Sequence, residues 1–213
     1  MNFNNFLKLV SKINNIPLPA EVSHVKMSPP YRLKLIKMQK EKIKNAKQSA
    51  VLALFYPDEE QQTKLVLILR KTYKGVHSAQ VGFPGGKPEK QDDSLQETAL
   101  RETEEEIGVS RKNIHVIREF SSVYIPPSNF QVYPFIGVCK KTPCFVKQEN
   151  EVEELIEVSL QDFLNPKNLT YKTVSTSYNI DVEVPAFNFN NYLVWGATAM
   201  MLSELKDLLK KVM

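Results

Sequence analysis

The hydrophobic residues of this chain follow a helical rhythm near the N-terminus and a strand-like rhythm over most of the remainder. Over residues 3–13 the apolar side chains recur on one helix face, which predicts a short amphipathic helix. Pro29 and Pro30 open a second predicted helix that continues to about Lys47. The candidate buried positions are Phe3, Phe6, Leu7, Val10 and Ile13 in the first helix, and Leu33, Leu35, Ile36, Met38 and Ile43 in the second. We interpret residues 1–47 as an N-terminal helical extension that is not an independent domain.

From residue 48 onward, short runs of apolar and β-branched residues favour strands. We expect strands at 49–56, 64–70, 81–83, 114–124, 132–140, 170–178 and 180–187, and a strand that passes into a short helix over 151–164. An internal helix from about Ser94 to Ile107 interrupts the strands, and an amphipathic helix over residues 198–212 follows them. Strands around an internal helix and a closing helix predict an α/β layered domain, which we place at residues 48–213.

The composition is that of an ordinary globular protein, with 42% hydrophobic and 24% charged residues. No apolar run reaches the length of a membrane span, and the first residues lack a signal-peptide layout. We therefore expect no membrane partner and a cytoplasmic location. Cys139 and Cys144 have no histidine near them in sequence, so we interpret them as ordinary reduced cysteines rather than zinc ligands.

Charge is unevenly distributed along the chain. Residues 1–50 contain ten basic and two acidic residues, a net charge of +8, which leaves −4 for the remainder because the total is +4. A basic segment beside an acidic body helps to attract a polyanionic substrate, whereas a solvated lysine-rich helix face is the alternative interpretation. No aromatic residues interleave with the lysines in a binding motif, so we expect no nucleic-acid partner.

The most informative segment is 85–109, which joins a Gly-Gly loop to the predicted internal helix. Glu102, Glu105 and Glu106 stand at i, i+3 and i+4, so a helix places all three carboxylates on one face. Like charges this close repel one another, and a hard divalent cation such as Mg²⁺, which takes oxygen ligands, balances them. A solvated helix face is the alternative for a run of charges. Four of the seven glycines lie in or beside this segment, which favours a close approach to a ligand.

This segment resembles the Nudix box, G-x5-E-x7-R-E-U-x-E-E-x-G-U, where U is a bulky aliphatic residue. The second half matches in register at Arg101, Glu102, Glu105, Glu106, Gly108 and Val109. Thr103 stands at the first aliphatic position. The preceding loop is one residue longer than the standard box, so the early acid falls on Asp92 when counted from Gly86 and on Asp93 when counted back from Arg101. Both aspartates stay open as candidates for that position.

The resemblance implies a Nudix α/β/α sandwich around a mixed β-sheet. It also implies hydrolysis of a pyrophosphate bond with Mg²⁺ or Mn²⁺ as the cofactor. The metal ligands implied by the box are Glu102, Glu105 and Glu106, and Arg101 is expected to orient a glutamate through a charge-assisted hydrogen bond. Glu105 is one candidate for the general base, because this box position serves as the base in some relatives. A later acid is the other candidate, either as base or as further metal ligand, at Glu151, Glu153 or Glu154.

A second resemblance concerns the substrate. The sequence LILRKTYKGVHSAQVGFPGG, residues 67–86, resembles the motif that distinguishes coenzyme A pyrophosphatases within the Nudix family, roughly LLTxRSxxLRxHxGQVxFPGG. The matches are Leu67, Arg70, His77, Gln80, Val81, Phe83, Pro84, Gly85 and Gly86, and the departures are Ile68, Lys71, Lys74, Gly75 and Ala79. The resemblance implies cleavage of coenzyme A, or of an acyl or oxidised form, to 3′,5′-ADP and 4′-phosphopantetheine.

The candidate substrate contacts are Arg70, His77, Gln80, Gly85, Gly86 and Lys87. Each of the side chains has an ordinary alternative: Arg70 as an ion pair at a strand end, His77 as a turn residue, and Lys87 as an exposed loop residue. We interpret Trp195, the only tryptophan, as a packing residue rather than a platform on which a base stacks.

Two other functions stay open at this stage. A different Nudix substrate, such as ADP-ribose, a dinucleotide or a nucleoside triphosphate, is consistent with the five departures from the upstream motif. A non-catalytic nucleotide-binding Nudix module is the other alternative, and the intact Glu102, Glu105 and Glu106 argue against it. In each case the expected partner is a small-molecule nucleotide. Homodimers are common in the family, but no segment of this sequence identifies a dimer contact.

Overall fold

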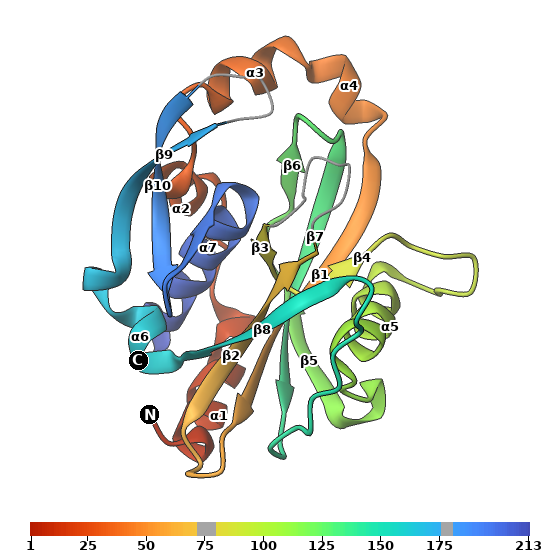
Figure 1. Ribbon diagram of the computed structural model, residues 1–213, viewed down its shortest axis with the longest axis vertical. Coiled ribbons are helices and arrows are strands. Elements are labelled where there is room, and N and C mark those ends of the chain that lie inside the picture. Colours follow the sequence, from red (N-terminus) through yellow and green to blue (C-terminus); the bar gives the residue numbers. More distant parts are fainter. Residues whose placement is uncertain (72–79, 176–180) are drawn as a thin grey trace.

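The computed structural model describes residues 1–71, 80–175 and 181–213, and its centre is a mixed sheet of eight strands (Figure 1). The strands are β1 (Lys47–Pro57), β2 (Thr63–Arg70), β3 (Val81–Gly82), β4 (Gly85–Gly86), β5 (Ile114–Glu119), β6 (Val123–Ile125), β7 (Phe130–Cys139) and β8 (Val152–Ser159). The main order is β3-β2-β1-β7-β5, with β4 paired to β1, β6 to β7 and β8 to β2. Only β1 and β7 run parallel, and the other pairs are antiparallel.

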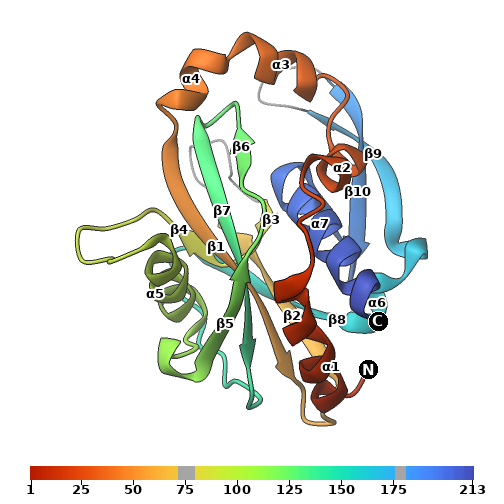
Figure 2. The same ribbon diagram turned by 180° about the vertical axis from the view of Figure 1, so that it is seen from behind.

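The two faces of this sheet are covered by different helices, because successive side chains of a strand point to opposite faces. On β1, Leu52 and Leu54 belong to the apolar cluster beneath α5 (Leu95–Ile107). Ala53 and Phe55 belong to the other cluster, beneath α1 (Phe3–Val10) and α7 (Gly196–Val212). Figure 2 shows α5 on one side of the sheet and α1 with α7 on the other. The predicted α/β/α sandwich around a mixed sheet is therefore confirmed.

The helix α5 begins and ends where its sequence predicts. The side chain of Ser94 caps the first turn by accepting a hydrogen bond from the N–H of Glu97 at 3.2 Å. Gly108 ends the helix in the left-handed conformation, with φ at 74°, and its N–H donates to the carbonyl oxygen of Glu104. The apolar side of the helix packs on the sheet, and Glu102 and Glu106 lie next to the glycines of β4.

The N-terminal region confirms one predicted helix and corrects the other. In α1 and the 3-10 turn that follows (Ser11–Asn15), the side chains of Phe3, Phe6, Val10 and Ile13 are buried in the main core. The predicted second helix is two short helices, α3 (Arg32–Met38) and α4 (Lys40–Lys44), because Gln39 leaves the helical conformation with φ at −111° and ψ at 22°. None of its five expected apolar positions is buried, and Met38 is 73% exposed.

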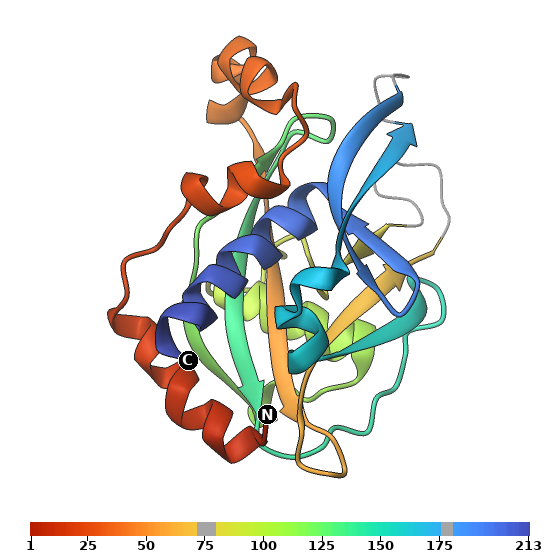
Figure 3. The same cartoon turned by 90° about the vertical axis from the view of Figure 1, so that its left-hand side faces the viewer.

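The position of α3 and α4 explains this exposure. The pair arches over one end of the molecule between β1 and the small C-terminal sheet, so most of its surface faces solvent (Figure 1). The chain reaches this arch through α2 (Glu21–His24) and a 3-10 turn (Val25–Met27), which lie against α7 (Figure 3). The lysines of both short helices place charged groups in solvent, and neither helix has a fully buried side chain.

A buried polar cluster fastens α2 to α7. His24 Nε2 lies 2.7 Å from Glu204 Oε2, and the hydroxyl of Ser121 donates to Glu204 Oε1 at 2.6 Å. The N–H of Ala20 donates to the same carboxylate at 3.1 Å. Burial alone raises the pKa of Glu204, but these hydrogen bonds outweigh it and bring the pKa below its ordinary value. The cluster thereby holds the segment that leads to α3 on the surface of α7.

The C-terminal part adds a second, three-stranded antiparallel sheet beside α7. Its strands are β9 (Leu169–Ser175), β10 (Asp181–Phe189) and β11 (Tyr192–Trp195), in the order β11-β10-β9. The strand β11 was not predicted, although Asn190 and Asn191 form a tight turn with φ at 51° and 68°, which is typical of a hairpin. A short helix, α6 (Leu160–Leu164), and 3-10 turns at Arg111–Asn113 and Pro166–Asn168 complete the secondary structure. No helix within the described ranges is both long and apolar enough to cross a membrane.

Candidate active site

The three glutamates of the predicted metal site lie on α5 next to β4, but they differ in exposure. The side chain of Glu106 is 1% exposed, that of Glu102 is 15% exposed, and that of Glu105 is 55% exposed. The N–H of Gly85 donates to Glu106 Oε2 at 2.8 Å, and this bond connects β4, hereafter the glycine strand, to α5. The helical spacing predicted from the sequence thus forms a graded carboxylate face, buried at Glu106 and open at Glu105.

Arg101 is the organising cation of this face. Its side chain is 3% exposed, and Nη1 donates to Glu102 at 3.0 Å and to Glu105 at 2.9 Å. Its Nη2 also donates to the carbonyl oxygen of Lys87 at 2.9 Å, which links the helix to the loop after β4. One guanidinium therefore holds two of the three glutamates and the loop in a fixed arrangement.

Asp92, and not Asp93, is the partner of Arg101. Asp92 accepts from Arg101 Nε at 2.9 Å and Nη2 at 3.0 Å, and from the hydroxyl of Thr98 at 2.9 Å. The Arg101 guanidinium holds the pKa of Asp92 far below its usual range, and the bond from the N–H of Glu89 acts in the same direction. Asp93 is exposed. The N–H of Asp92 donates to the carbonyl oxygen of Glu89 at 3.1 Å, so a turn brings the chain to Asp92.

Arg70 holds the third glutamate. From the end of β2, its Nη1 donates to Glu106 Oε1 at 3.0 Å and its Nη2 to the carbonyl oxygen of Gly85 at 2.7 Å. Burial raises the pKa of Glu106 to about 7, against the opposing charge of Arg70 and the hydrogen bond from Gly85. Burial likewise raises the pKa of Glu102. A carboxylate face with raised pKa values is poised to take up a cation.

Gly86 leaves the space that Glu102 occupies. A Cβ at this position would lie 2.3–2.4 Å from the carboxyl atoms of Glu102, so any larger residue displaces that carboxylate. In the described ranges no group of three or more His, Cys, Asp or Glu side chains converges closely enough to hold a metal ion, and the carboxylates of the face are bonded to Arg101 and Arg70. The donor set is nonetheless oxygen alone, which fits Mg²⁺ or Mn²⁺ rather than softer metals.

The three later acids differ in how they relate to this face. The charge of Glu151 helps to raise the pKa values of both Glu102 and Glu106, so its carboxylate faces them electrostatically. Glu153 lies 4.0 Å from Lys71, and Glu154 accepts a hydrogen bond from the hydroxyl of Tyr192 at 2.8 Å. Of the three, Glu151 is the one that the fold brings toward the carboxylate face.

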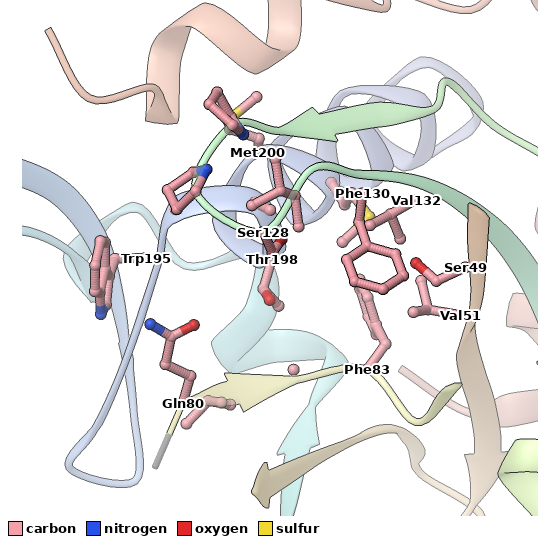
Figure 4. Close-up of a pocket in the computed structure, with 18 of the residues that line it drawn as sticks. Ser49, Val51, Gln80, Phe83, Ser128, Phe130, Val132, Trp195, Thr198 and Met200 are labelled. Atoms are coloured by element: carbon pink, nitrogen blue, oxygen red, sulfur yellow. The ribbon is translucent and has the colours of Figure 1, made fainter. Parts of the chain in front are cut away.

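A cavity of about 900 Å³ opens over the glycine strand. Figure 4 shows Gln80 and Trp195 on one side of it, with Phe83, Phe130 and Val51 on the other. The predicted contacts Arg70, Gln80, Gly85, Gly86 and Lys87 all line the cavity, whereas His77 lies outside the described residues. Lys87 is exposed at its edge, where its Nζ stands 5.7 Å from the centre of the Phe130 ring.

The sequence did not identify several residues of the cavity wall. Tyr31, Arg32 and Leu35 come from α3 and the turn before it, in the N-terminal extension. The turn between β6 and β7 adds residues 125–128. Trp195, interpreted from the sequence as a packing residue, is half-buried and lines the cavity. No local pattern marks these positions, because only the tertiary fold brings them to one space.

Comparison with known proteins identifies the family. Residues 46–176 match the NUDIX domain family. The uncharacterized Nudix hydrolase NudL of Yersinia enterocolitica serotype O:8 / biotype 1B is 34% identical over 148 residues, 66% of this chain and 71% of the relative. NudL of Pectobacterium atrosepticum is 33% identical over 152 residues, 66% of this chain and 72% of the relative. The chain belongs to the Nudix hydrolase family, whose substrates are nucleotides linked to another group through a diphosphate.

Solved structures agree with this assignment at the level of the fold. The Nudix hydrolase RenU of M. smegmatis superimposes with a TM-score of 0.54 at 14% sequence identity, covering 79% of this chain and 88% of RenU. At this identity the likeness concerns the fold alone.

Proposed function

We propose that this protein hydrolyses the pyrophosphate bond of coenzyme A, or of an acyl or oxidised form, and releases 3′,5′-ADP and 4′-phosphopantetheine. The cavity of about 900 Å³ over Gly85 and Gly86 carries the proposal. Ligand pockets commonly measure about 300–1,000 Å³, so this cavity has room for a substrate longer than a mononucleotide. Arg70, Gly85 and Gly86 line this cavity and contact Glu102 or Glu106, which supports a position of the substrate diphosphate near the candidate metal ligands.

The chemistry of the cavity supports the same substrate. Arg70, Lys87 and the backbone of Gly85 and Gly86 lie at one end and suit a diphosphate. The apolar part of the wall suits the pantetheine arm, which carries no charge; it includes Val51, Phe83, Phe130, Val132, Met200 and Met201. The upstream resemblance to coenzyme A pyrophosphatases falls on Arg70, Gln80, Phe83 and the two glycines, all of which line this cavity.

We assign the metal to Glu102, Glu105 and Glu106. These carboxylates would hold a divalent cation, which would supply charge neutralisation for the phosphates and activation of a water molecule. Arg101 acts as a positioning residue, because its Nη1 holds Glu102 and Glu105 while Asp92 holds the guanidinium. Arg70, which lines the cavity, positions Glu106 in the same way.

The general base is assigned to one of two carboxylates. Glu105 is half-exposed on the helix face, where solvent reaches it, and Glu151 faces the same cluster from the segment before β8. A base must reach the attacking water within hydrogen-bonding distance. Glu151→Gln separates the two, because Glu105 is also assigned as a metal ligand. If Glu151 is the base, Glu151→Gln lowers kcat and changes the pH–rate profile with metal affinity retained. An unchanged kcat and profile assign the base to Glu105.

A substrate panel tests the proposal. Purified protein is offered coenzyme A, ADP-ribose, NADH and nucleoside triphosphates with Mg²⁺ or Mn²⁺, and the products are separated by chromatography. We expect the highest kcat/KM with coenzyme A and release of 3′,5′-ADP. Faster turnover of another substrate assigns the protein to a different Nudix specificity. Binding of nucleotides without any turnover assigns it to the non-catalytic modules.

A further inference from the structure

Arg32 is unlike the other arginines of this chain in its partners. The chain has five arginines, and three of them lie within 3.0 Å of an aspartate or glutamate oxygen: Arg70, Arg101 and Arg111. Arg118 donates instead to three backbone carbonyl oxygens. Arg32 Nη2 donates to the carbonyl oxygen of Tyr124 at 2.7 Å, but its buried Nε has no hydrogen-bond partner among the described residues. The structure thus holds a guanidinium in place while one of its inner donors stays unused.

The side chain that carries this unused donor lines the cavity proposed for the substrate. Arg32 is the first residue of α3, and with Tyr31 and Leu35 it forms the wall that the N-terminal extension contributes. The strands β4, β1, β7 and β6 are successive neighbours, and Arg32 is bonded to β6 at Tyr124. Three strand spacings of about 4.8 Å place Tyr124 roughly 14 Å across the sheet from Gly86. Arg32 therefore serves a part of the ligand that lies away from the scissile bond.

The electrostatics of Arg32 favour an anion. No carboxylate of the described residues forms an ion pair with it; Glu21 is the acid whose charge acts on it most, and Glu21 is exposed. Burial lowers the pKa of Arg32, yet a guanidinium stays charged in proteins. A partly buried cation with an unused N–H is costly by itself, and a phosphate that accepts from its planar fork removes that cost.

We propose that Arg32 binds a phosphate monoester of the substrate outside the scissile diphosphate. The inference rests on the proposed function: coenzyme A carries one anionic group apart from its diphosphate, the 3′-phosphate of the adenosine half. The guanidinium of Arg32 donates to this phosphate while Nη2 keeps its bond to Tyr124. The N-terminal extension thereby distinguishes coenzyme A from nucleotides that lack a 3′-phosphate.

The test compares coenzyme A with dephospho-coenzyme A, which lacks the 3′-phosphate, in the full-length protein. We expect wild type to prefer coenzyme A by about 10- to 100-fold in kcat/KM, the size of a charge-assisted contact. Arg32→Gln removes this preference by lowering kcat/KM for coenzyme A, with dephospho-coenzyme A unchanged within about twofold. Arg32→Lys keeps part of the preference because it keeps the charge. Lys34→Gln, an equal loss of charge at an exposed position of α3, leaves both values unchanged.

The outcomes separate this proposal from the proposed function. Equal turnover of both substrates by wild type, or an equal loss with both substrates in Arg32→Gln, overturns the role of Arg32 while coenzyme A remains the substrate. Turnover of neither substrate overturns the proposed function. Arg32 is then tested by calorimetry with 3′,5′-ADP and 5′-AMP. A preference for 3′,5′-ADP that Arg32→Gln abolishes supports the phosphate contact, and equal affinities in wild type overturn it.

Discussion

Arg101 and Asp92 form a two-point ion pair beneath the carboxylate face, with Nε 2.9 Å from Oδ1 and Nη2 3.0 Å from Oδ2. Both side chains are 3% exposed. Because Nη1 of the same guanidinium donates to Glu102 and Glu105, the aspartate sets the orientation of two candidate metal ligands without facing the metal itself. Asp92, which lies in the loop that is one residue longer than in the Nudix box, thus positions the guanidinium of Arg101.

Replacing Asp92 tests this relationship. Asp92→Asn removes the two-point anion of a buried guanidinium and leaves it only Glu102 and Glu105, so we expect the free energy of unfolding to fall by about 1.5–3 kcal/mol and kcat to fall as well. Asp93→Asn is the matched control, because Asp93 is exposed, and its effect on stability should stay within about 0.5 kcal/mol. Urea denaturation and steady-state kinetics measure both. Equal effects of the two substitutions would contradict the assignment of Asp92.

The pH dependence of stability gives the same pair a second signature. The pKa of Asp92 is lowered by Arg101, so its contribution is fully present above the unfolded pKa of about 3.9 and is lost as the pH falls toward the lower folded pKa. The difference in unfolding free energy between wild type and Asp92→Asn should therefore shrink when the pH is lowered from about 5 to about 2. A constant difference over this range would show that Asp92 is not the ionised partner.

The glutamates of α5 should matter for catalysis more than for stability. Glu105→Gln and Glu106→Gln should each lower kcat by about 100- to 1,000-fold while the protein stays folded. Glu106 accepts hydrogen bonds from Arg70 and from the N–H of Gly85, so its amide variant also loses some stability, and circular dichroism checks that the variant is folded before kcat is compared. Glu104→Gln is the control within the same acidic run, since Glu104 pairs with Arg111 away from the cavity. Near-wild-type kcat in both Glu105→Gln and Glu106→Gln would refute the metal face.

The glycine strand allows a test of shape without any change of charge. Gly86→Ala places a methyl group 2.3–2.4 Å from the carboxyl of Glu102, so this carboxylate must move, and we expect weaker Mg²⁺ binding and a kcat lowered by at least about 10-fold. At Gly82 a methyl group meets nothing nearer than the Thr198 hydroxyl at 3.8 Å, so Gly82→Ala should be close to neutral. Titration calorimetry with Mg²⁺ and kinetics compare the two variants. Unchanged metal affinity in Gly86→Ala would show that Glu102 is not a ligand.

The contact between His24 and Glu204 should fasten the N-terminal extension to the rest of the protein. We propose that the extension is part of one cooperative unit, because α1 and α7 share one core. Glu204→Ala removes a buried partner of His24, Ser121 and Ala20, and we expect a loss of about 3–5 kcal/mol.

The control for this prediction is Lys26→Ala. It breaks the pair with Asp207, in which the lysine side chain is 52% exposed, and should cost about 1 kcal/mol or less. Urea denaturation measured by circular dichroism gives both values. A separate early transition in wild type would instead identify the extension as an independent unit.

The sequence predicted best the elements whose signals are local. The helix α5 carries its own cap at Ser94, its own stop at Gly108 and its carboxylates at helical spacing, so its bounds and its functional face could both be predicted. The prediction of one helix across α3 and α4 was wrong. None of its periodic apolar residues is buried, and periodicity alone does not show whether a helix has a surface to pack against.

The site residues that could not be predicted depend on contacts between distant segments. Asp92 and Asp93 are neighbours in sequence, and only the direction of the turn after Glu89 decides which one reaches Arg101. Arg32 lies outside every motif, and its role follows from a bond to Tyr124, 92 residues away. Such pairings are fixed by the packed fold and leave no local pattern.

We propose that the glutamates of α5 hold the cation needed to hydrolyse the diphosphate of coenzyme A. The most direct measurement is mass-spectrometric identification of the products formed from coenzyme A by wild type and Glu105→Gln, with Mg²⁺ and with excess chelator. We expect equal amounts of 3′,5′-ADP and 4′-phosphopantetheine from wild type with Mg²⁺, and little product with chelator or from Glu105→Gln. Intact coenzyme A under all conditions, beside rapid cleavage of ADP-ribose or another nucleotide, would contradict it.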